Sequence, residues 1–187
     1  MAILRKTLQA LLCGALALTI FLRGASGAEA PTEYQVKAVF VFNFSRFVEW
    51  PPQTFTAPNE PFVIGILGSD PFGGRLDEAV RGEQIDQHPL VVRRFRSLGE
   101  IGDCQILYID RSVSAEVQQV LAALDHRSTL TVSDFDGASE RGVMIQFTTE
   151  NNRIRLRINA ESARAAGLTI SSKLLRSADI VGAHNGS

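Results

Sequence analysis

The segment G-S-D-P-F-G-G-R at residues 68–75 has the glycine spacing of a phosphate-binding loop but not its chemistry. Gly74 stands where such a loop needs its lysine, and Arg75 stands where it needs a hydroxyl for magnesium. Asp70 would repel a phosphate, and Pro71 lacks the N–H that would bind one. The segment is therefore predicted to be an ordinary strand-to-helix turn capped by Asp70.

Other residues that could do chemistry are scattered. The acidic segment S-D-F-D-G (133–137) is of a type that binds hard cations, but no third spaced ligand and no terminal bidentate glutamate follow it, so a solvated turn is favoured. His88, His126 and His184 are far apart and form no metal-ligand cluster. No G-x-S-x-G motif is present, and Cys104 carries no sign of an activated thiolate. The sequence thus predicts no catalytic residue, no metal site and no cofactor, and hence a protein that is not an enzyme.

The strand pattern at residues 153–158 alternates cations with apolar residues, so one face is buried and the other carries Arg153, Arg155 and Arg157. Two interpretations remain open. The arginines form either a solvated face that pairs with acids across the sheet or a docking surface for an acidic partner.

A strongly apolar helix is expected from Glu33 to Glu49, ending at W-P-P because a residue before proline is forced out of the helical region. Its aromatic and β-branched side chains extend well beyond one core stripe. Val41, Phe42 and Trp50 are therefore candidates for a partner interface, where large aromatic side chains often anchor binding.

The elements that position these residues alternate between strands and helices. After the first helix, apolar runs predict strands at residues 62–67, 90–95, 105–109 and 129–132. A short helix capped by Asp70 and beginning at Pro71 is expected after the first of these strands, and a second helix from Ser112 or Ser114 to Leu124. Strands at 143–148 and 153–158 follow, joined through E-N-N as a hairpin, and then a helix at 161–166, an extended segment at 168–172 and a helical turn at 173–178. This order predicts an α/β fold: a single-domain three-layer sandwich with a mixed, mostly parallel sheet and a C-terminal antiparallel hairpin.

The ends of two of these strands form a second possible site. In open α/β sheets, ligands bind beyond the carboxyl ends of the parallel strands. Gly68, Ser69, Asp70 and Asp110 follow such strands, and we expect them to line a candidate ligand crevice.

Residues 1–28 are predicted to be a cleaved signal peptide, with Arg5 and Lys6 before an uncharged stretch and small residues at Ser26 and Ala28 before the cut. Cleavage would leave 159 of the 187 residues and remove three cations and no acid, taking the formal net charge from −1 to −4. An acidic exported domain argues against nucleic-acid binding. The domain is expected over 29–182, with a flexible tail at 183–187. Cys104 would then be the only cysteine, either buried, which is favoured, or paired between chains.

Three blocks of sequence carry a family resemblance. They are Y-Q-V-K-A-V-F-V-F-N-F-S-R-F-V-E-W-P (34–51), D-C-Q-I-L-Y-I (103–109), and an end block. The end block runs from G-V-M-I-Q-F (142–147) through N-R-I-R-L-R-I-N (152–159) to G-L-T-I-S-S-K-L-L (167–175). The chain resembles the YfiR-like family of bacterial periplasmic proteins, and the residues of the signature include Asn43, Phe44, Trp50, Pro51, Cys104 and Asn159.

The resemblance implies a non-enzymatic regulator in the periplasm. It implies repression of an inner-membrane diguanylate cyclase through the periplasmic domain of that enzyme, which lowers cyclic di-GMP and biofilm formation. It also implies sequestration by an outer-membrane, peptidoglycan-associated lipoprotein, and a homodimer. The two disulfides of the family's namesake are not expected, because the predicted mature chain has one cysteine. The alternative hypothesis is a periplasmic module that binds or senses a small ligand.

Overall fold

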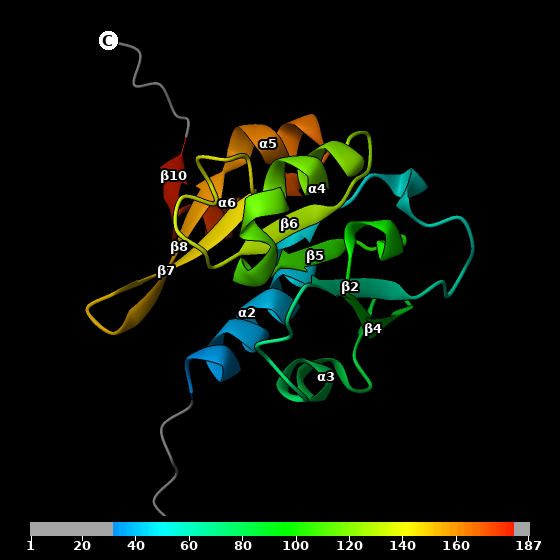
Figure 1. The fold of residues 1–187 in the computed structure, drawn as a ribbon. Coiled ribbons are helices and arrows are strands. Elements are labelled where there is room, and N and C mark those ends of the chain that lie inside the picture. The colour runs from blue at the N-terminus through cyan, green and yellow to red at the C-terminus, as the bar shows by residue number, and fades with distance from the viewer. Residues whose placement is uncertain (1–31, 182–187) are drawn as a thin grey trace, which may run out of the picture. The chain divides into compact units, whose positions relative to one another are not determined.

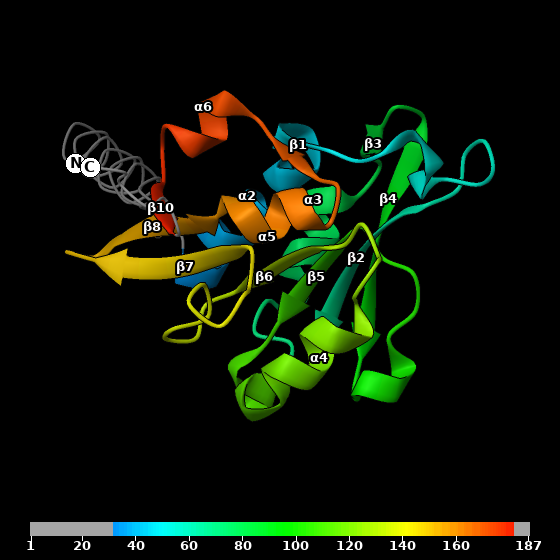
Figure 2. The same ribbon diagram turned by 90° about the horizontal axis from the view of Figure 1, so that it is seen from above.

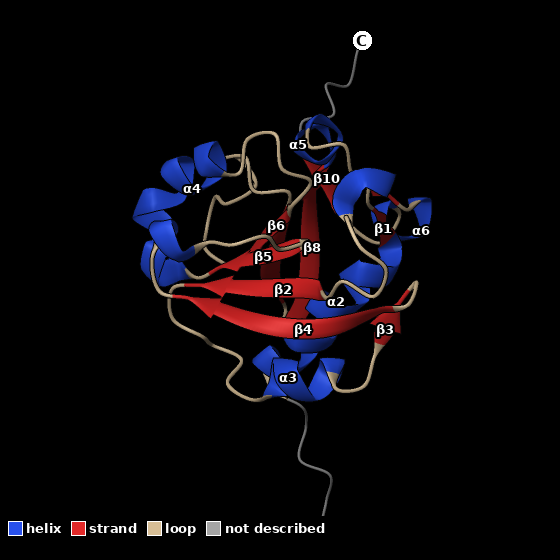
Figure 3. Ribbon diagram, turned by 90° about the vertical axis from the view of Figure 1, so that its right-hand side faces the viewer, coloured by secondary structure: helices blue, strands red, loops and turns tan. Residues whose placement is uncertain are grey.

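The computed structural model describes residues 32–181, so the predicted signal peptide (1–28) and tail (183–187) lie outside the described residues. An eight-stranded sheet has the order β10-β8-β7-β6-β5-β2-β4-β3, and much of that order can be followed in Figure 3. The central pairs β4–β2, β2–β5, β5–β6 and β6–β7 are parallel, as is β10–β8, whereas β7–β8 and β3–β4 are antiparallel. The predicted mixed, mostly parallel sheet with a late antiparallel hairpin is confirmed.

The strands of this sheet are β2 (Phe62–Leu67), β3 (Gln84–Ile85), β4 (His88–Phe95), β5 (Ile106–Ile109), β6 (Leu130–Ser133), β7 (Ile145–Glu150), β8 (Arg153–Asn159) and β10 (Asp179–Val181). A separate two-stranded ribbon pairs β1 (Val48–Glu49) with β9 (Thr169–Ile170). The α-helices are α2 (Glu33–Phe47), α3 (Arg75–Val80), α4 (Val117–Ala123), α5 (Ala160–Ala165) and α6 (Ser172–Leu175). The short 3-10 helices within residues 32–181 are η2 (Pro52–Thr54), η3 (Leu98–Glu100) and η4 (Arg111–Glu116).

Helices cover both faces of the sheet, which gives the predicted three layers (Figures 1 and 2). On one face, Val41 and Phe44 of α2 belong to a core cluster with Ile64 of β2 and Tyr108 of β5. On the other face, Val117 of α4 belongs to a second core cluster with β2 and β5 residues. Strands β2 and β5 are buried along their whole length, as continuous apolar runs require. None of the helices within residues 32–181 is long and apolar enough to cross a membrane.

Helix α2 begins with a capping box. The Thr32 side chain accepts a hydrogen bond from the Gln35 N–H, and the Gln35 side chain accepts one from the Thr32 N–H. The helix ends at Phe47, two residues earlier than predicted, because Val48 and Glu49 turn into the β1 strand and pair with β9. That pairing lies more than a hundred residues away along the chain, so local sequence does not reveal it.

Helix α3 and strand β10 also differ from the predictions. Helix α3 begins at Arg75, because Asp70 instead caps the turn before it, accepting hydrogen bonds from the N–H groups of Phe72 (2.8 Å) and Gly73 (3.2 Å). Strand β10 was not predicted. It adds only three residues to the edge of the sheet, too few for an alternating pattern to show.

Candidate functional site

The predicted interface on α2 is partly wrong. Val41 has an exposed fraction of 0% and packs into the core, so it is not available to a partner. Phe42 is half-buried, with the Arg46 guanidinium 4.7 Å above its ring. The apolar residue of this helix that does face solvent is Val39, at 51% exposed. Sequence reasoning missed it because the buried stripe of α2 includes Lys37, which shifts the stripe away from the position that apolar spacing alone suggests.

Trp50 lies at the end of α2 and β1, on the wall of a groove of about 760 Å³. Its indole N–H donates to the Gln105 carbonyl oxygen (3.2 Å), and its ring meets Phe62 edge-on with centroids 4.9 Å apart. Phe55 lines the same groove, and its ring stacks on His88 with centroids 3.6 Å apart. We call this the Trp50 groove. It is lined by Ser45, Arg46, Val48, Glu49, Trp50, Pro51, Pro52, Phe55, Phe62, Gln84, Ile85, Asp86 and His88.

The first and last blocks of the signature meet next to the Trp50 groove. Val48 pairs with Ile170 in the β1–β9 ribbon, and the Ser171 N–H donates to the Phe47 carbonyl oxygen (2.8 Å). Gly167 has φ +76°, and a Cβ added there would lie 3.3 Å from Pro51 Cγ. The blocks at 34–51 and 167–175 are thus in direct contact in the folded chain.

Two further signature residues, Phe44 and Asn159, have structural roles. Phe44 is fully buried and stacks with Phe147, with centroids 5.8 Å apart. Asn159 caps α5 by accepting from the Ser162 N–H (3.0 Å), and its side-chain amide donates to the Ser139 carbonyl oxygen (3.2 Å). Asn43 is half-buried, and nothing in the structure explains its place in the signature.

The residues predicted to line a ligand crevice lie close together, but their polar groups form hydrogen bonds and an ion pair within the protein. Ser69 donates its N–H to Ser112 Oγ (3.1 Å), and Asp110 accepts from the Ser112 N–H (2.9 Å). Asp70 caps its own turn and forms an ion pair with Arg94 (2.8 Å). Gly68 has φ +91°, and a Cβ there would come within 2.7 Å of Ser112 Oγ. The segments that follow β2 and β5 therefore pack tightly against each other, and the polar groups of Ser69, Asp70 and Asp110 already have hydrogen-bond or ion-pair partners within the protein.

A buried ionic cluster joins α2 to the loop after β6, and the sequence did not predict it. Lys37 is 2% exposed, and its Nζ lies 2.7 Å from Asp134 Oδ2 and 2.6 Å from Glu33 Oε1. The Tyr34 hydroxyl donates to Asp134 Oδ2 (2.9 Å), and Arg111 lies 3.4 Å from Asp134 Oδ1. The predicted solvated turn at 133–137 is wrong for Asp134, which is held by a lysine 97 residues away.

Burial and the neighbouring charges shift the pKa values of the ionisable groups in and beside this cluster. Burial by itself would raise the pKa of Asp134, but the hydrogen bond and charge of Lys37, the Tyr34 hydroxyl and the charge of Arg111 hold that pKa below its ordinary value. Burial and the hydrogen bond to Asp134 raise the pKa of Tyr34 to about 12. Burial also raises the pKa of Tyr108, whose hydroxyl has no hydrogen-bond partner within residues 32–181. The cluster is thus a charged lysine–carboxylate pair that fixes α2 on the sheet.

Cys104 is buried with a free thiol, as the favoured prediction held. Burial raises its pKa to about 12, so the thiol is protonated at neutral pH and a poor nucleophile. In the part of the chain that the structure describes, no group of three or more His, Cys, Asp or Glu side chains is placed to hold a metal ion.

The arginine ladder lies on β8 as predicted, with Leu156 and Ile158 buried on the opposite face. Arg157 is held by Glu140 at 2.5 Å. Arg153 and Arg155 are exposed near the tip of the β7–β8 hairpin, which extends beyond the helices (Figures 1 and 2). The structure therefore divides the predicted ladder into one paired and two exposed arginines.

Comparison with known proteins identifies a family. The sequence matches the family model described as YfiR/HmsC-like over residues 34–179. No curated protein matches the chain. Among solved structures, the chain is similar to the ABC domain in complex with L-Trp from Streptococcus pneumonia, with a TM-score of 0.52 and 12% identity. The match covers 79% of this chain and 60% of that one, and the likeness concerns the fold alone.

Proposed function

Because the chain belongs to the YfiR/HmsC-like family, whose members are periplasmic, non-catalytic regulators of cyclic di-GMP signalling, we propose that it represses an inner-membrane diguanylate cyclase. It does so by binding the periplasmic domain of that enzyme, which lowers cyclic di-GMP and biofilm formation. The observation that carries this proposal is the family match over residues 34–179. Binding shifts the cyclase between an active and an inactive arrangement, which requires different affinities for the two states.

The surfaces offered to the partner are those that remain accessible. Phe42 and Trp50 contribute aromatic area near the end of α2, and Arg153 and Arg155 contribute positive charge on β8. Aromatic and arginine side chains are the types that most often dominate binding energy at interfaces. An outer-membrane, peptidoglycan-associated lipoprotein would relieve repression by competing for these surfaces, and a second copy of the chain is a further proposed partner.

Deletion of the gene tests the proposal. Cyclic di-GMP should rise in the deletion strain and return to the wild-type level when the gene is restored on a plasmid. Trp50→Leu removes the indole N–H and part of the groove wall, so restoration by this variant should be weaker if the Trp50 groove is the docking surface. The control is Val39→Ala, which shortens an exposed side chain that does not line the groove. An unchanged cyclic di-GMP level on deletion would contradict the proposed function.

A small-ligand module is the second candidate. The Trp50 groove has a volume of about 760 Å³ and aromatic walls, within the range of small-molecule sites. The fold neighbour from Streptococcus pneumonia was solved with L-Trp bound. Thermal unfolding of the purified domain with a panel of amino acids, L-tryptophan included, tests this function. A rise in Tm that Trp50→Leu abolishes supports it, and no shift with any compound weighs against it.

A further inference from the structure

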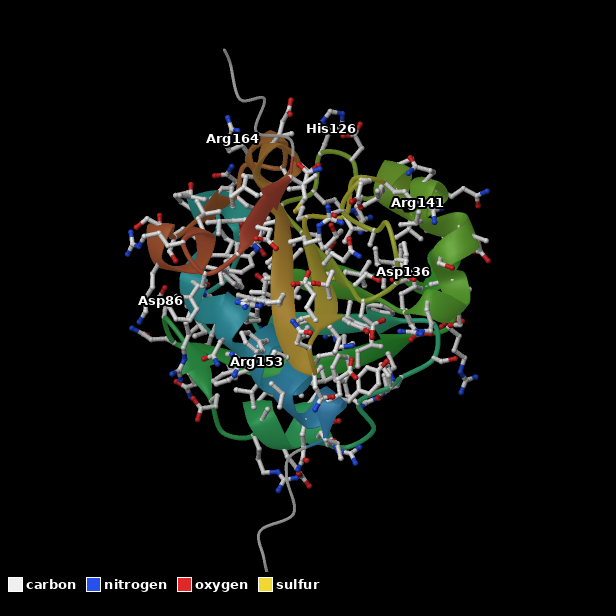
Figure 4. All side chains as sticks on the ribbon, turned by 90° about the vertical axis from the view of Figure 1, so that its left-hand side faces the viewer. Asp86, His126, Asp136, Arg141, Arg153 and Arg164 are labelled. Atoms are coloured by element: carbon white, nitrogen blue, oxygen red, sulfur yellow. The ribbon has the colours of Figure 1, made fainter. Side chains whose placement is uncertain are left out.

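Strand β8 is paired along only half of one edge. On one side it pairs with β7 from Arg153 to Ile158. On the other side β10 pairs with residues 157–159 alone. Within residues 32–181, the edge from Arg153 to Leu156 therefore has no neighbouring strand, and Figure 4 shows Arg153 at the end of β8 away from β10. An unpaired edge presents free backbone donors and acceptors to another chain.

The register identifies which backbone groups face outward. Asn151 and Asn152 form a two-residue turn with φ of 48° and 61°, so Glu150 and Arg153 are the hydrogen-bonded pair that closes the hairpin. The same alternation continues to Asn159, whose N–H donates to the Met144 carbonyl oxygen across the hairpin (2.8 Å). The intervening residues Ile154 and Leu156 accordingly direct their N–H and C=O groups to the open side.

The side chains along this open edge are cationic. Arg153 and Arg155 are exposed, and within residues 32–181 neither has a carboxylate at ion-pair distance, whereas Arg157 is held by Glu140. A groove of about 330 Å³ runs beside the edge. It is lined by Glu150, Arg155, Leu156, Arg176, Ser177, Ala178 and Asp179. Arg176 therefore adds a third cation beside the edge, and Glu150 and Asp179 add two carboxylates.

A second copy of the chain does not fit this edge. If two copies paired antiparallel here, the outward residues Ile154 and Leu156 would have to pair with their counterparts. The alternation of a strand then places Arg153 and Arg155 of one copy directly opposite arginines of the other, on the same face. Like charges in directly opposite positions are destabilising, so the arginines disfavour self-pairing.

We infer that the open edge at Arg153–Leu156 binds an extended acidic segment of another protein as an added strand. Backbone hydrogen bonds to Ile154 and Leu156 supply affinity, and acidic side chains at alternate positions of the segment meet Arg153 and Arg155. Apolar residues at the intervening positions fall on the face of Ile154 and Leu156. The inference rests on the proposed function only in that the protein acts through contact with another protein.

The test uses purified protein with residues 1–28 removed and an acetylated, amidated octapeptide of alternating valine and glutamate. Isothermal titration measures affinity, and amide NMR signals locate the contact. We expect binding, with shifts centred on Ile154 and Leu156. An octapeptide of four valines followed by four glutamates, and an alternating peptide with N-methyl groups along one edge, should each bind at least about tenfold more weakly, because they lose the alternation or the backbone donors.

A charge-reversed protein provides the second arm. Arg153→Glu with Arg155→Glu should weaken binding of the alternating peptide at least about tenfold, because two interfacial charge pairs are reversed. The matched control, Arg81→Glu with Arg93→Glu, makes the same change in net charge at two other exposed arginines and should bind as wild type does. Equal binding of the block peptide would show attraction of acids without strand pairing, and overturns the inference. Absence of binding would mean that the arginines only prevent unwanted strand pairing at this edge, and it would also overturn the inference. Neither result bears on whether gene deletion raises cyclic di-GMP, so failure of the inference and failure of the proposed function are separable.

Discussion

Replacing Lys37 by methionine should destabilise the protein far more than breaking a surface ion pair. The Lys37 and Asp134 side chains are 3% and 1% exposed, and their charged atoms lie 2.7 Å apart. Methionine leaves the Asp134 carboxylate buried with only the Tyr34 hydroxyl and the more distant Arg111. Removing one partner of a buried pair costs about 3–5 kcal/mol, and because those two contacts remain we expect about 3 kcal/mol. With a urea slope of about 2 kcal/mol/M, the unfolding midpoint falls by about 1.5 M.

Urea unfolding followed by fluorescence measures this change, since Trp50 is the single tryptophan of the chain and packs on Phe62. The matched control is Arg46→Met, which breaks the half-exposed pair between Arg46 and Glu83 and should cost less than about 1 kcal/mol. Lys37→Met combined with Asp134→Leu should recover part of the loss, because no unpaired charge remains buried. A cost for Lys37→Met equal to that of Arg46→Met would refute the reasoning.

The same pair sets a pH dependence. The folded protein holds the pKa of Asp134 below its unfolded value of about 4, so the ionised carboxylate contributes stability above that pH. The contribution is lost as the pH falls through the folded pKa. In Lys37→Met the pKa of Asp134 rises, so the stability gap between the variant and the wild type should narrow below pH 4. If the difference in unfolding free energy between the wild type and Lys37→Met stays constant between pH 7 and pH 3, the ion pair is not the cause of that difference.

Other features predict distinct outcomes. Gly167→Ala should lower the free energy of unfolding by about 1–3 kcal/mol, and by more than Gly82→Ala does. Both glycines have positive φ, but only at Gly167 would the added Cβ also crowd Pro51. The Cys104 thiol, with its pKa raised to about 12, should react with Ellman's reagent at pH 8 only after unfolding in urea. Rapid reaction in the folded state would contradict the burial. Arg153→Thr with Arg155→Thr should make the protein self-associate with rising concentration in sedimentation velocity, because the like-charge barrier at the β8 edge is gone. A variant that stays monomeric wherever the wild type does would contradict that argument.

The parts of the fold that the sequence predicts well are those dictated by local burial. The apolar run Phe62–Leu67 gave strand β2 with its observed bounds, because a strand covered on both faces shows an uninterrupted apolar pattern. The alternation in β8 likewise predicted its buried and charged faces. Short elements stabilised by distant partners were not predictable. The β1–β9 ribbon and β10 have two or three residues each and depend on pairings that only the folded chain creates.

The same distinction applies to the candidate site. Burial of Lys37 depends on Asp134, which lies 97 residues away, so helical spacing alone made Val41 seem accessible. The arginine ladder was visible in the sequence, whereas its open edge required the strand order and the length of β10. The arginines of β8 could thus be identified from the sequence, whereas the open edge beside them and the burial of Val41 required the folded structure.

The central claim is regulation of cyclic di-GMP from the periplasm, and one complementation measurement tests it most directly. A deletion strain carries either the full-length gene or a version lacking residues 2–28, and cyclic di-GMP is quantified by mass spectrometry at matched protein levels. The full-length gene should restore the low wild-type level, and the version without the predicted signal peptide should leave cyclic di-GMP high. Equal restoration by both versions, or no rise on deletion, would contradict the account.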